Sequence, residues 1–130
     1  MFEPGRLQAT SPERLVAWCR SLMFLNGAFW IGAGLWTVQS FGSRSGDIPV
    51  AILVGLMFGN AAFLFGLAYR LRGLGPSVLI AAPLWIAVNL VLSFTDEIGL
   101  PDLMVGLLNL VTLVLLLVLG AVWWRRRKER

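Results

Sequence analysis

Four long runs of apolar residues, separated by short polar segments, dominate the sequence. The run at 21–38 holds 18 residues without a charge. At about 1.5 Å per residue its helix would be roughly 27 Å long, close to the roughly 30 Å hydrocarbon thickness of a bilayer. The pattern predicts an all-α membrane protein: an antiparallel four-helix transmembrane bundle that forms a single domain over 1–130. Its spans are expected at about 15–38, 48–69, 77–95 and 102–124.

Proline and cap-forming residues mark the expected helix starts. Ser11 precedes Pro12, and this pair suits the cap and the first position of a helix. Asp47 and Asp102 stand at the starts of the second and fourth spans, where a carboxylate favours the positive end of the helix dipole. Pro83 lies inside the third span and is expected to kink it, because proline cannot donate the helical hydrogen bond.

The composition and the distribution of charge support a membrane location. The chain of 130 residues is 58% hydrophobic and 14% charged, with a mean hydropathy of +0.78. Soluble domains usually carry about 25% charged residues. Ten of the eleven basic residues lie in 1–20, 70–72 and 125–130, which four spans place on one side of the membrane. The positive-inside rule then predicts that both termini are cytoplasmic, and the net charge of +4 indicates topology and no nucleic-acid partner.

The side chains that usually carry catalysis or bind metals are scarce. The chain has no histidine and one cysteine, Cys19, which excludes imidazole catalysis, histidine-ligated metals and an intramolecular disulfide. Since no nucleophile–base pair stands out either, we expect no enzyme and no cofactor. The first 20 residues lack an apolar core followed by a small-residue cleavage site, so the first span is expected to stay in the mature protein.

One asparagine falls in each predicted span, where an amide facing lipid would cost several kcal/mol. Counted from the outer ends of the spans, Asn26 and Asn60 lie about 12 residues deep, and Asn89 and Asn109 about 6 to 7 residues deep. These depths predict one polar tier between the first two spans and another between the last two, whose asparagine-bearing faces should meet. The network is either interhelical glue or a polar path for an ion or small solute. Its candidate members are Asn26, Asn60, Asn89, Ser93 and Asn109.

Small residues form stripes at helical spacing in the first two spans. Gly55 and Gly59 make a G-x-x-x-G step, which Ala62 and Gly66 repeat with alanine. Such faces let two helices approach closely in lipid, within the chain or between subunits. Seven of twelve positions match between 21–32 and 55–66, which indicates either an inverted duplication, as in many transporters, or one packing problem solved twice. The predicted helix-packing residues are Ser21, Ala28, Gly32, Gly55, Gly59, Ala62 and Gly66.

An acidic cluster is expected on the outer surface, formed by Asp96, Glu97 and Asp102. Clustered carboxylates could hold a divalent cation weakly, because hard cations prefer oxygen ligands. Helix capping, turn formation and topology explain the same residues without a metal, so we assign no metal site.

The segment NLVLSFTDEIGLPDL at 89–103, followed closely by LLNLVTLVLLLVLG, resembles small, uncharacterised four-helix bacterial integral membrane proteins. The NGAFW and FGN segments of the first two spans are similar to the same group, and the resemblance covers about 20–125. It implies a location in the bacterial cytoplasmic (inner) membrane, but no activity and no functional residues. The chain is also similar in size to small multidrug exporters, but its first span lacks the glutamate on which those proteins depend.

These features favour a non-enzymatic structural or accessory component that contacts the lipid bilayer and packs with itself, as a homo-oligomer, or with a larger membrane complex. The alternative is a small oligomeric channel or transporter for an ion or small solute. A cleft that reaches two or more asparagines would favour transport, whereas closed amide pairs and an exposed small-residue face would favour packing.

Overall fold

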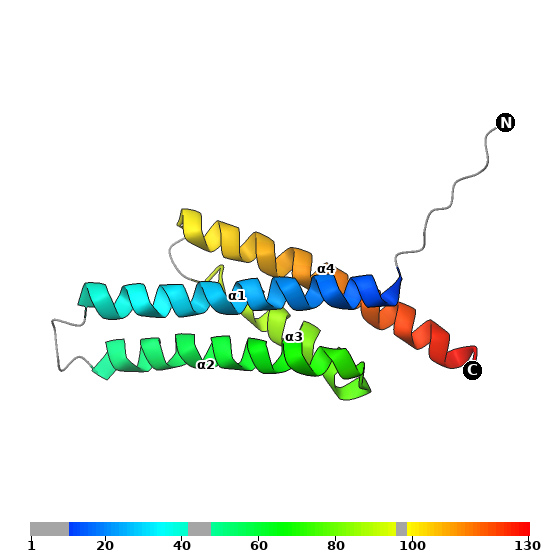
Figure 1. The fold of residues 1–130 in the computed structure, drawn as a ribbon. Helices are drawn as coiled ribbons and strands as arrows, with labels where there is room; N and C mark the ends of the chain where they lie inside the picture. Colours follow the sequence, from blue (N-terminus) through cyan, green and yellow to red (C-terminus); the bar gives the residue numbers. More distant parts are fainter. Residues whose placement is uncertain (1–10, 42–47, 96–98) are drawn as a thin grey trace.

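Four α-helices make up most of the molecule (Figure 1). The computed structural model describes residues 11–41, 48–95 and 99–130, of which 92% are helical and none lies in a strand. The predicted all-α class is therefore confirmed. A short 3-10 helix, η1 (Leu71–Gly73), follows the second α-helix. The α-helices are α1 (Pro12–Phe41), α2 (Ile48–Arg70), α3 (Pro76–Leu92) and α4 (Leu100–Lys128).

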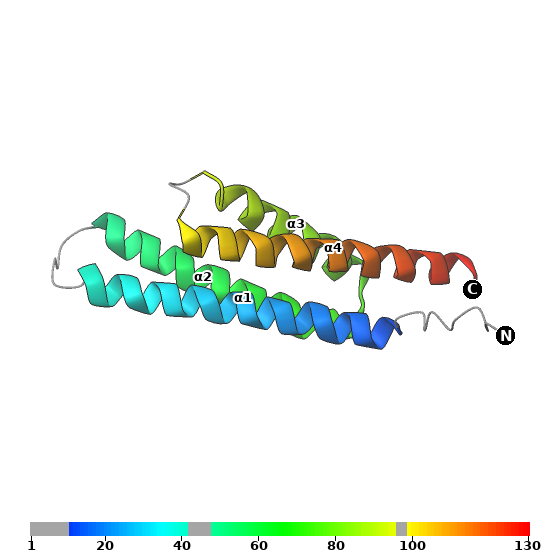
Figure 2. The ribbon, with the colours of Figure 1, turned by 90° about the horizontal axis from the view of Figure 1, so that it is seen from above.

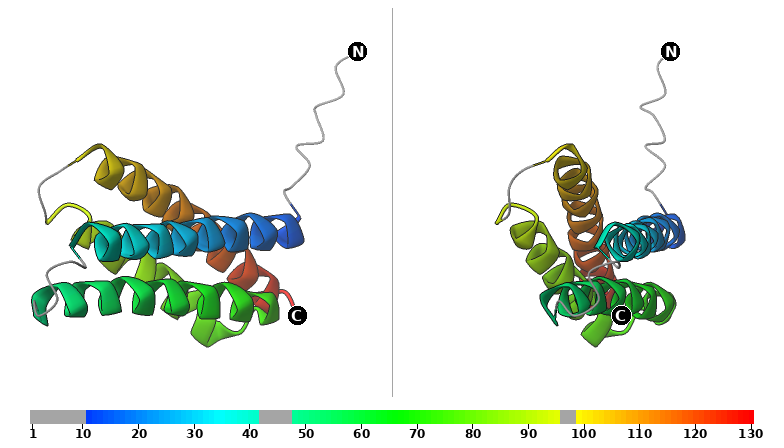
Figure 3. Two further views of the ribbon diagram at one scale, coloured as in Figure 1. Left: turned by 60° about the vertical axis from the view of Figure 1, so that its left-hand side comes forward. Right: turned by 90° about the vertical axis from the view of Figure 1, so that its left-hand side faces the viewer.

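The helices associate as two pairs. α1 packs along α2, α3 packs against α4, and α1 also contacts α4. α2 and α3 make few contacts although they are consecutive, and they diverge with distance from η1 (Figures 2 and 3). The start of α1 and the end of α4 lie toward the same end of the molecule as η1 (Figure 1). The two pairs of helices are therefore joined mainly through α1 and α4.

Three of the helices are long and apolar enough to cross a membrane: α1, the segment Pro49–Gly73 and α4. α3 is apolar but has only 17 residues, near the lower limit of about 17 residues for a spanning helix. Many large apolar side chains on all four helices are exposed, as expected for surfaces that face lipid tails.

The predicted helix starts agree with the backbone hydrogen bonds. α1 begins at Pro12, and the N–H groups of Arg14 and Leu15 donate to the carbonyl of Ser11 at 2.9 and 3.2 Å. α4 begins two residues before the expected position, and Asp102 accepts a hydrogen bond at Oδ2 from the N–H of Gly99 at 3.0 Å. The expected capping role of Asp102 is thus confirmed, whereas Asp47 lies outside the described residues.

α3 ends at Leu92, three residues before the predicted boundary. The hydroxyl of Ser93 donates to the carbonyl of Asn89 at 2.8 Å, and the N–H of Phe94 donates to the carbonyl of Val91 at 3.1 Å. Hydroxyl groups that bond the preceding turn, together with i→i−3 bonds, replace the regular helical pattern. The helix continues through Pro83 without interruption.

The buried apolar core lies in the half of the molecule nearest η1. It joins Cys19 and Met23 of α1 to Leu64 of α2, Ile86 of α3 and Leu116 of α4, all of which are essentially inaccessible. Arg20 adds a polar tie, because its Nε donates to the carbonyl of Ala68 at 2.9 Å. The two helix pairs are thus held together by apolar packing at this end.

The α1–α2 interface uses two glycines of α1 to admit two aromatic rings of α2. A Cβ at Gly27 would lie 2.7 Å from the ring of Phe65, and one at Gly34 would lie 3.2 Å from the ring of Phe58. Both glycines are buried. Close packing of these two helices therefore depends on small residues that are not those of the predicted stripes.

Candidate functional site

The asparagine of α1 pairs with the asparagine of α4. Asn26 donates from Nδ2 to Oδ1 of Asn109 at 2.5 Å, and neither side chain has any accessible surface. Within the described residues, Oδ1 of Asn26 and Nδ2 of Asn109 have no hydrogen-bond partner. The pair is therefore a closed amide contact at the junction of the two helix pairs, with half of its hydrogen-bonding capacity unused.

The asparagine of α2 pairs with the asparagine of α3 in a larger network. Asn60 donates from Nδ2 to Oδ1 of Asn89 at 2.7 Å and accepts at its own Oδ1 from Nε1 of Trp85 at 2.8 Å. Asn89 donates in turn to the carbonyl of Trp85 at 3.0 Å. The hydroxyl of Ser93 donates to the carbonyl of Asn89, so Ser93 extends the network at its edge. The network joins α2 and α3, which otherwise scarcely touch.

The predicted pairing of the asparagines is wrong. The sequence placed Asn26 with Asn60 and Asn89 with Asn109, on the assumption that all helices end in one outer plane. α4 instead begins partway along α1 and crosses it (Figure 1). The hydrogen bond between the two amides shows that Asn109 lies beside Asn26. α3 and α4 do pack together as expected, but the polar face of α3 with Asn89 is bonded to α2.

A cavity of about 420 Å³ lies beside the second amide pair, at the end of the molecule away from η1. All four α-helices contribute to its lining, which is mainly aliphatic and aromatic. Its rim includes exposed side chains of α2 and α3, such as Leu56 and Val88, so it opens at the surface between these helices. The polar residues of the lining are Asn60, Asn89, Ser93 and Asp102.

The predicted small-residue stripes face away from the bundle. All seven residues are exposed, and a Cβ added at Gly32, Gly55, Gly59 or Gly66 would meet no atom within 4 Å. Of the two uses expected for these stripes, packing within the chain is therefore wrong, whereas packing between subunits stays a prediction. In a spanning helix the face toward lipid is as apolar as the face toward protein, so spacing alone does not tell which face is buried. The outward residues are Ser21, Ala28, Gly32, Gly55, Gly59, Ala62 and Gly66.

Only one member of the predicted acidic cluster lies in the described part of the chain. Asp102 caps α4 and reaches the cavity, while Asp96 and Glu97 lie outside the described residues. Among the described residues, no group of three or more histidine, cysteine or acidic side chains could hold a metal ion.

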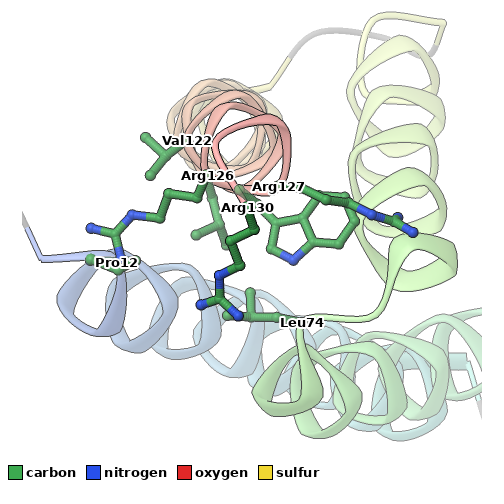
Figure 4. Close-up of a pocket in the computed structure, with 8 residues that line it drawn as sticks. Pro12, Leu74, Val122, Arg126, Arg127 and Arg130 are labelled. Carbon is green, nitrogen blue, oxygen red and sulfur yellow. The ribbon is translucent and has the colours of Figure 1, made fainter.

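A second cavity, of about 360 Å³, was not anticipated from the sequence. It lies where α4 ends, beside the start of α1 and the segment after η1, and three arginines line it (Figure 4). In the sequence these arginines indicate topology first, with attraction to anionic lipid as a second role. Arg126 follows Leu119, Val122 and Trp123 at helical spacing, and this pattern could have indicated that these residues share one face of the helix.

No family model matches this chain, and neither a curated protein nor a solved structure is significantly similar to it. The resemblance to small bacterial four-helix membrane proteins stays a prediction.

Proposed function

We propose that this chain is a small, non-enzymatic, multi-pass component of the bacterial cytoplasmic membrane that assembles with a second copy of itself. In this proposal the four helices form an antiparallel transmembrane bundle with both termini in the cytoplasm. The distribution of basic residues supports that orientation, and the three long apolar helices support membrane insertion. α3 is the shortest span and would cross with little tilt.

One observation carries the assembly proposal: the open small-residue face of α2. Gly55, Gly59, Ala62 and Gly66 are spaced 4, 3 and 4 residues apart, and all four are exposed. A face without side chains offers little contact to lipid tails but lets a second helix approach closely, so that van der Waals contacts and Cα–H···O bonds form along it. A G-x-x-x-G face is self-complementary, which makes a second copy of α2 the natural occupant.

Substitution of Gly59 by leucine tests this proposal. Leucine keeps the helix and its apolar character. Gly59 is exposed, and a Cβ added there would meet no atom within 4 Å, so the substitution should not disturb the single chain. It would nevertheless separate two α2 helices that meet at this position. We expect the wild type to form a dimer in mild detergent by native mass spectrometry and Gly59→Leu to shift it to monomer, with a dimer affinity at least about tenfold lower.

The matched control is Gly120→Leu, because Gly120 also lies in a long apolar helix with no atom within 4 Å of an added Cβ. This variant should remain a dimer. A monomeric wild type, or equal loss of the dimer in both variants, would contradict self-assembly through α2. Co-purification of another membrane protein that only Gly59→Leu loses would assign the same face to a larger complex.

The cavity beside Asn60 and Asn89 favours a second candidate function, binding and passage of a small solute. It reaches two of the four asparagines and the carboxylate-bearing Asp102. The other two asparagines form a closed, fully buried pair, so the polar residues do not make a continuous path. A binding role therefore has more support than a channel.

Flux from liposomes separates this candidate from assembly alone. Val88→Trp places a large side chain at the cavity, whereas Val91→Trp places the same side chain at an exposed position of α3 outside it. If the reconstituted protein carries a cation or small solute, the first variant should lower the rate by about tenfold and the second should leave it unchanged. Wild-type liposomes that leak no faster than empty ones would exclude passage.

A further inference from the structure

We infer that the arginine-lined cavity at the end of α4 binds the phosphate group of an anionic phospholipid. Three arginines contribute to the cavity, and none of the described residues that line it is acidic. Glu13 and Glu129, the acids adjacent to this region in sequence, do not line it. A guanidinium group donates two parallel hydrogen bonds to phosphate oxygens, so this lining suits a phosphate better than any other common membrane group.

The cavity is assembled by one face of α4 and its C-terminal extension. Counted from Leu119, the other lining residues of α4 follow after 3, 4, 7 and 8 positions, which places them on one side of the helix. They are Val122, Trp123, Arg126 and Arg127. Arg130 follows just beyond the helix, which ends at Lys128. The face is apolar up to Trp123 and basic beyond it. A lipid has the same division, with acyl chains on the membrane side and phosphate on the water side, so the face matches a phospholipid along its length.

Two other segments close the cavity opposite α4. Pro12 contributes from the start of α1, and Leu74 contributes from the segment that follows η1. Leu74 has the left-handed backbone conformation, with φ 46° and ψ 38°, which is unusual for a residue with a branched side chain. It packs against the buried core and also forms part of the cavity wall. The site is therefore a hollow between three chain segments and not merely a charged helix end.

The three arginines of the cavity differ in where their guanidinium groups lie. Figure 4 shows Arg126 and Arg130 extending from α4 toward Pro12 and Leu74, into the space between these segments. Arg127 lies over the ring of Trp123, with its guanidinium carbon 5.2 Å from the ring centroid. A cation held on an aromatic face is positioned rather than free. We therefore assign the direct phosphate contacts to Arg126 and Arg130.

A free phosphate ion would bind the arginines of this site but would make no favourable contact with its apolar lining. The apolar lining, which includes Leu119, Val122 and the ring of Trp123, would gain nothing from a small, strongly hydrated anion. Tryptophan is also enriched at the depth of lipid headgroups, and Trp123 and Trp124 immediately precede the basic residues. The proposal rests on membrane insertion of α4 and is independent of assembly through α2.

The test compares two pairs of neutralising substitutions in the full chain. Arg126→Gln with Arg130→Gln removes two charges from the cavity. Arg125→Gln with Lys128→Gln removes two charges from the same segment, at exposed residues that do not line it. The wild type and both double variants are titrated with phosphatidylglycerol and, separately, with phosphatidylcholine in mixed micelles. Native mass spectrometry then counts the lipids retained by each protein.

We expect the wild type to bind phosphatidylglycerol about tenfold or more tightly than phosphatidylcholine. The Arg126→Gln, Arg130→Gln variant (the cavity pair) should lose most of this preference. The Arg125→Gln, Lys128→Gln variant (the control pair) should bind phosphatidylglycerol only slightly more weakly than the wild type. Equal weakening by both pairs would show diffuse attraction by the basic tail and would overturn the site, as would a wild type without any preference. Circular dichroism checks that both double variants keep the wild-type helix content.

Competition distinguishes the two sources of phosphate. Excess inorganic phosphate, added at constant ionic strength, should leave phosphatidylglycerol bound, because it cannot replace the contacts of the acyl chains. If inorganic phosphate releases the lipid from the wild type but not from the cavity pair, the site takes the free anion and the lipid assignment is wrong.

Discussion

The amide pair between α1 and α4 and the pair between α2 and α3 have the same chemistry in different surroundings. Asn26 and Asn109 are fully buried, and within 11–41, 48–95 and 99–130 their side chains bond only to each other. Asn60 and Asn89 share a network with Trp85, and they line a cavity that opens at the surface. Each pair joins one helix pair to the other. The contribution of a polar residue in a membrane helix to stability therefore depends on its burial and on how many hydrogen-bond partners remain when one is lost.

The first pair lies where the two helix pairs make their main contact, and the second lies where they separate. α1 and α4 pack together along part of their lengths, whereas α2 and α3 make few contacts. The first pair is therefore expected to contribute to stability, because its groups can find neither water nor another partner. The second pair is expected to fix the position of α3 relative to α2, because little apolar packing does so there.

The largest effect in this comparison is expected for Asn109→Leu. The substitution leaves the amide of Asn26 buried without its partner, and it should lower the free energy of unfolding by about 2 kcal/mol. Replacing both asparagines by leucine should cost less than the sum of the two single substitutions, since no unpaired amide remains. Steric-trap unfolding in bicelles measures all four proteins of this cycle. Strict additivity would mean that the two amides do not interact in the native protein.

A smaller effect is expected for Asn89→Leu, about 1 kcal/mol. Asn60 then loses one partner but keeps the bond from Nε1 of Trp85, and it is not fully buried. The same unfolding measurement applies. The variant should also let α2 and α3 move apart, which a pair of spin labels on their outer ends would detect as a broader distance distribution. A loss of stability larger than that of Asn109→Leu would reverse the proposed ranking of the two pairs.

The sequence was sufficient to predict the four helices and that every asparagine would be used inside the protein. It was not sufficient to predict the partners. The depth of each asparagine was counted from the end of its own helix, which requires all ends to lie in one plane. α4 begins partway along α1 (Figure 1), and such an offset depends on how two helices pack and not on where the apolar run of either begins.

The direction of the helix faces was equally hard to predict. In α1 the apolar Leu25 is exposed and the polar Asn26 is completely buried. In a soluble protein leucine is usually buried and asparagine usually exposed, so the order is reversed here. Buried and lipid-facing surfaces are both apolar in a membrane protein, so the periodicity that orients a soluble helix is nearly absent. Gly27 and Gly34 face α2, while Gly32 of the same helix faces outward. Gly27 and Gly34 differ from Gly32 only in that each lies against an aromatic ring of α2.

The smallest effect is expected for Trp85→Phe, about 0.5 kcal/mol or less. The substitution removes the N–H that bonds Oδ1 of Asn60, but it keeps an aromatic ring against Phe63, whose centroid lies 4.3 Å from that of Trp85. Asn60 still bonds Asn89, so its amide is not left alone. The matched control is Trp36→Phe at an exposed position, which should change the unfolding free energy by a similar or smaller amount. If Trp85→Phe instead destabilised the protein as much as Asn109→Leu, the indole would be the main tie between α2 and α3. The amide pair beside the cavity would then be secondary to it.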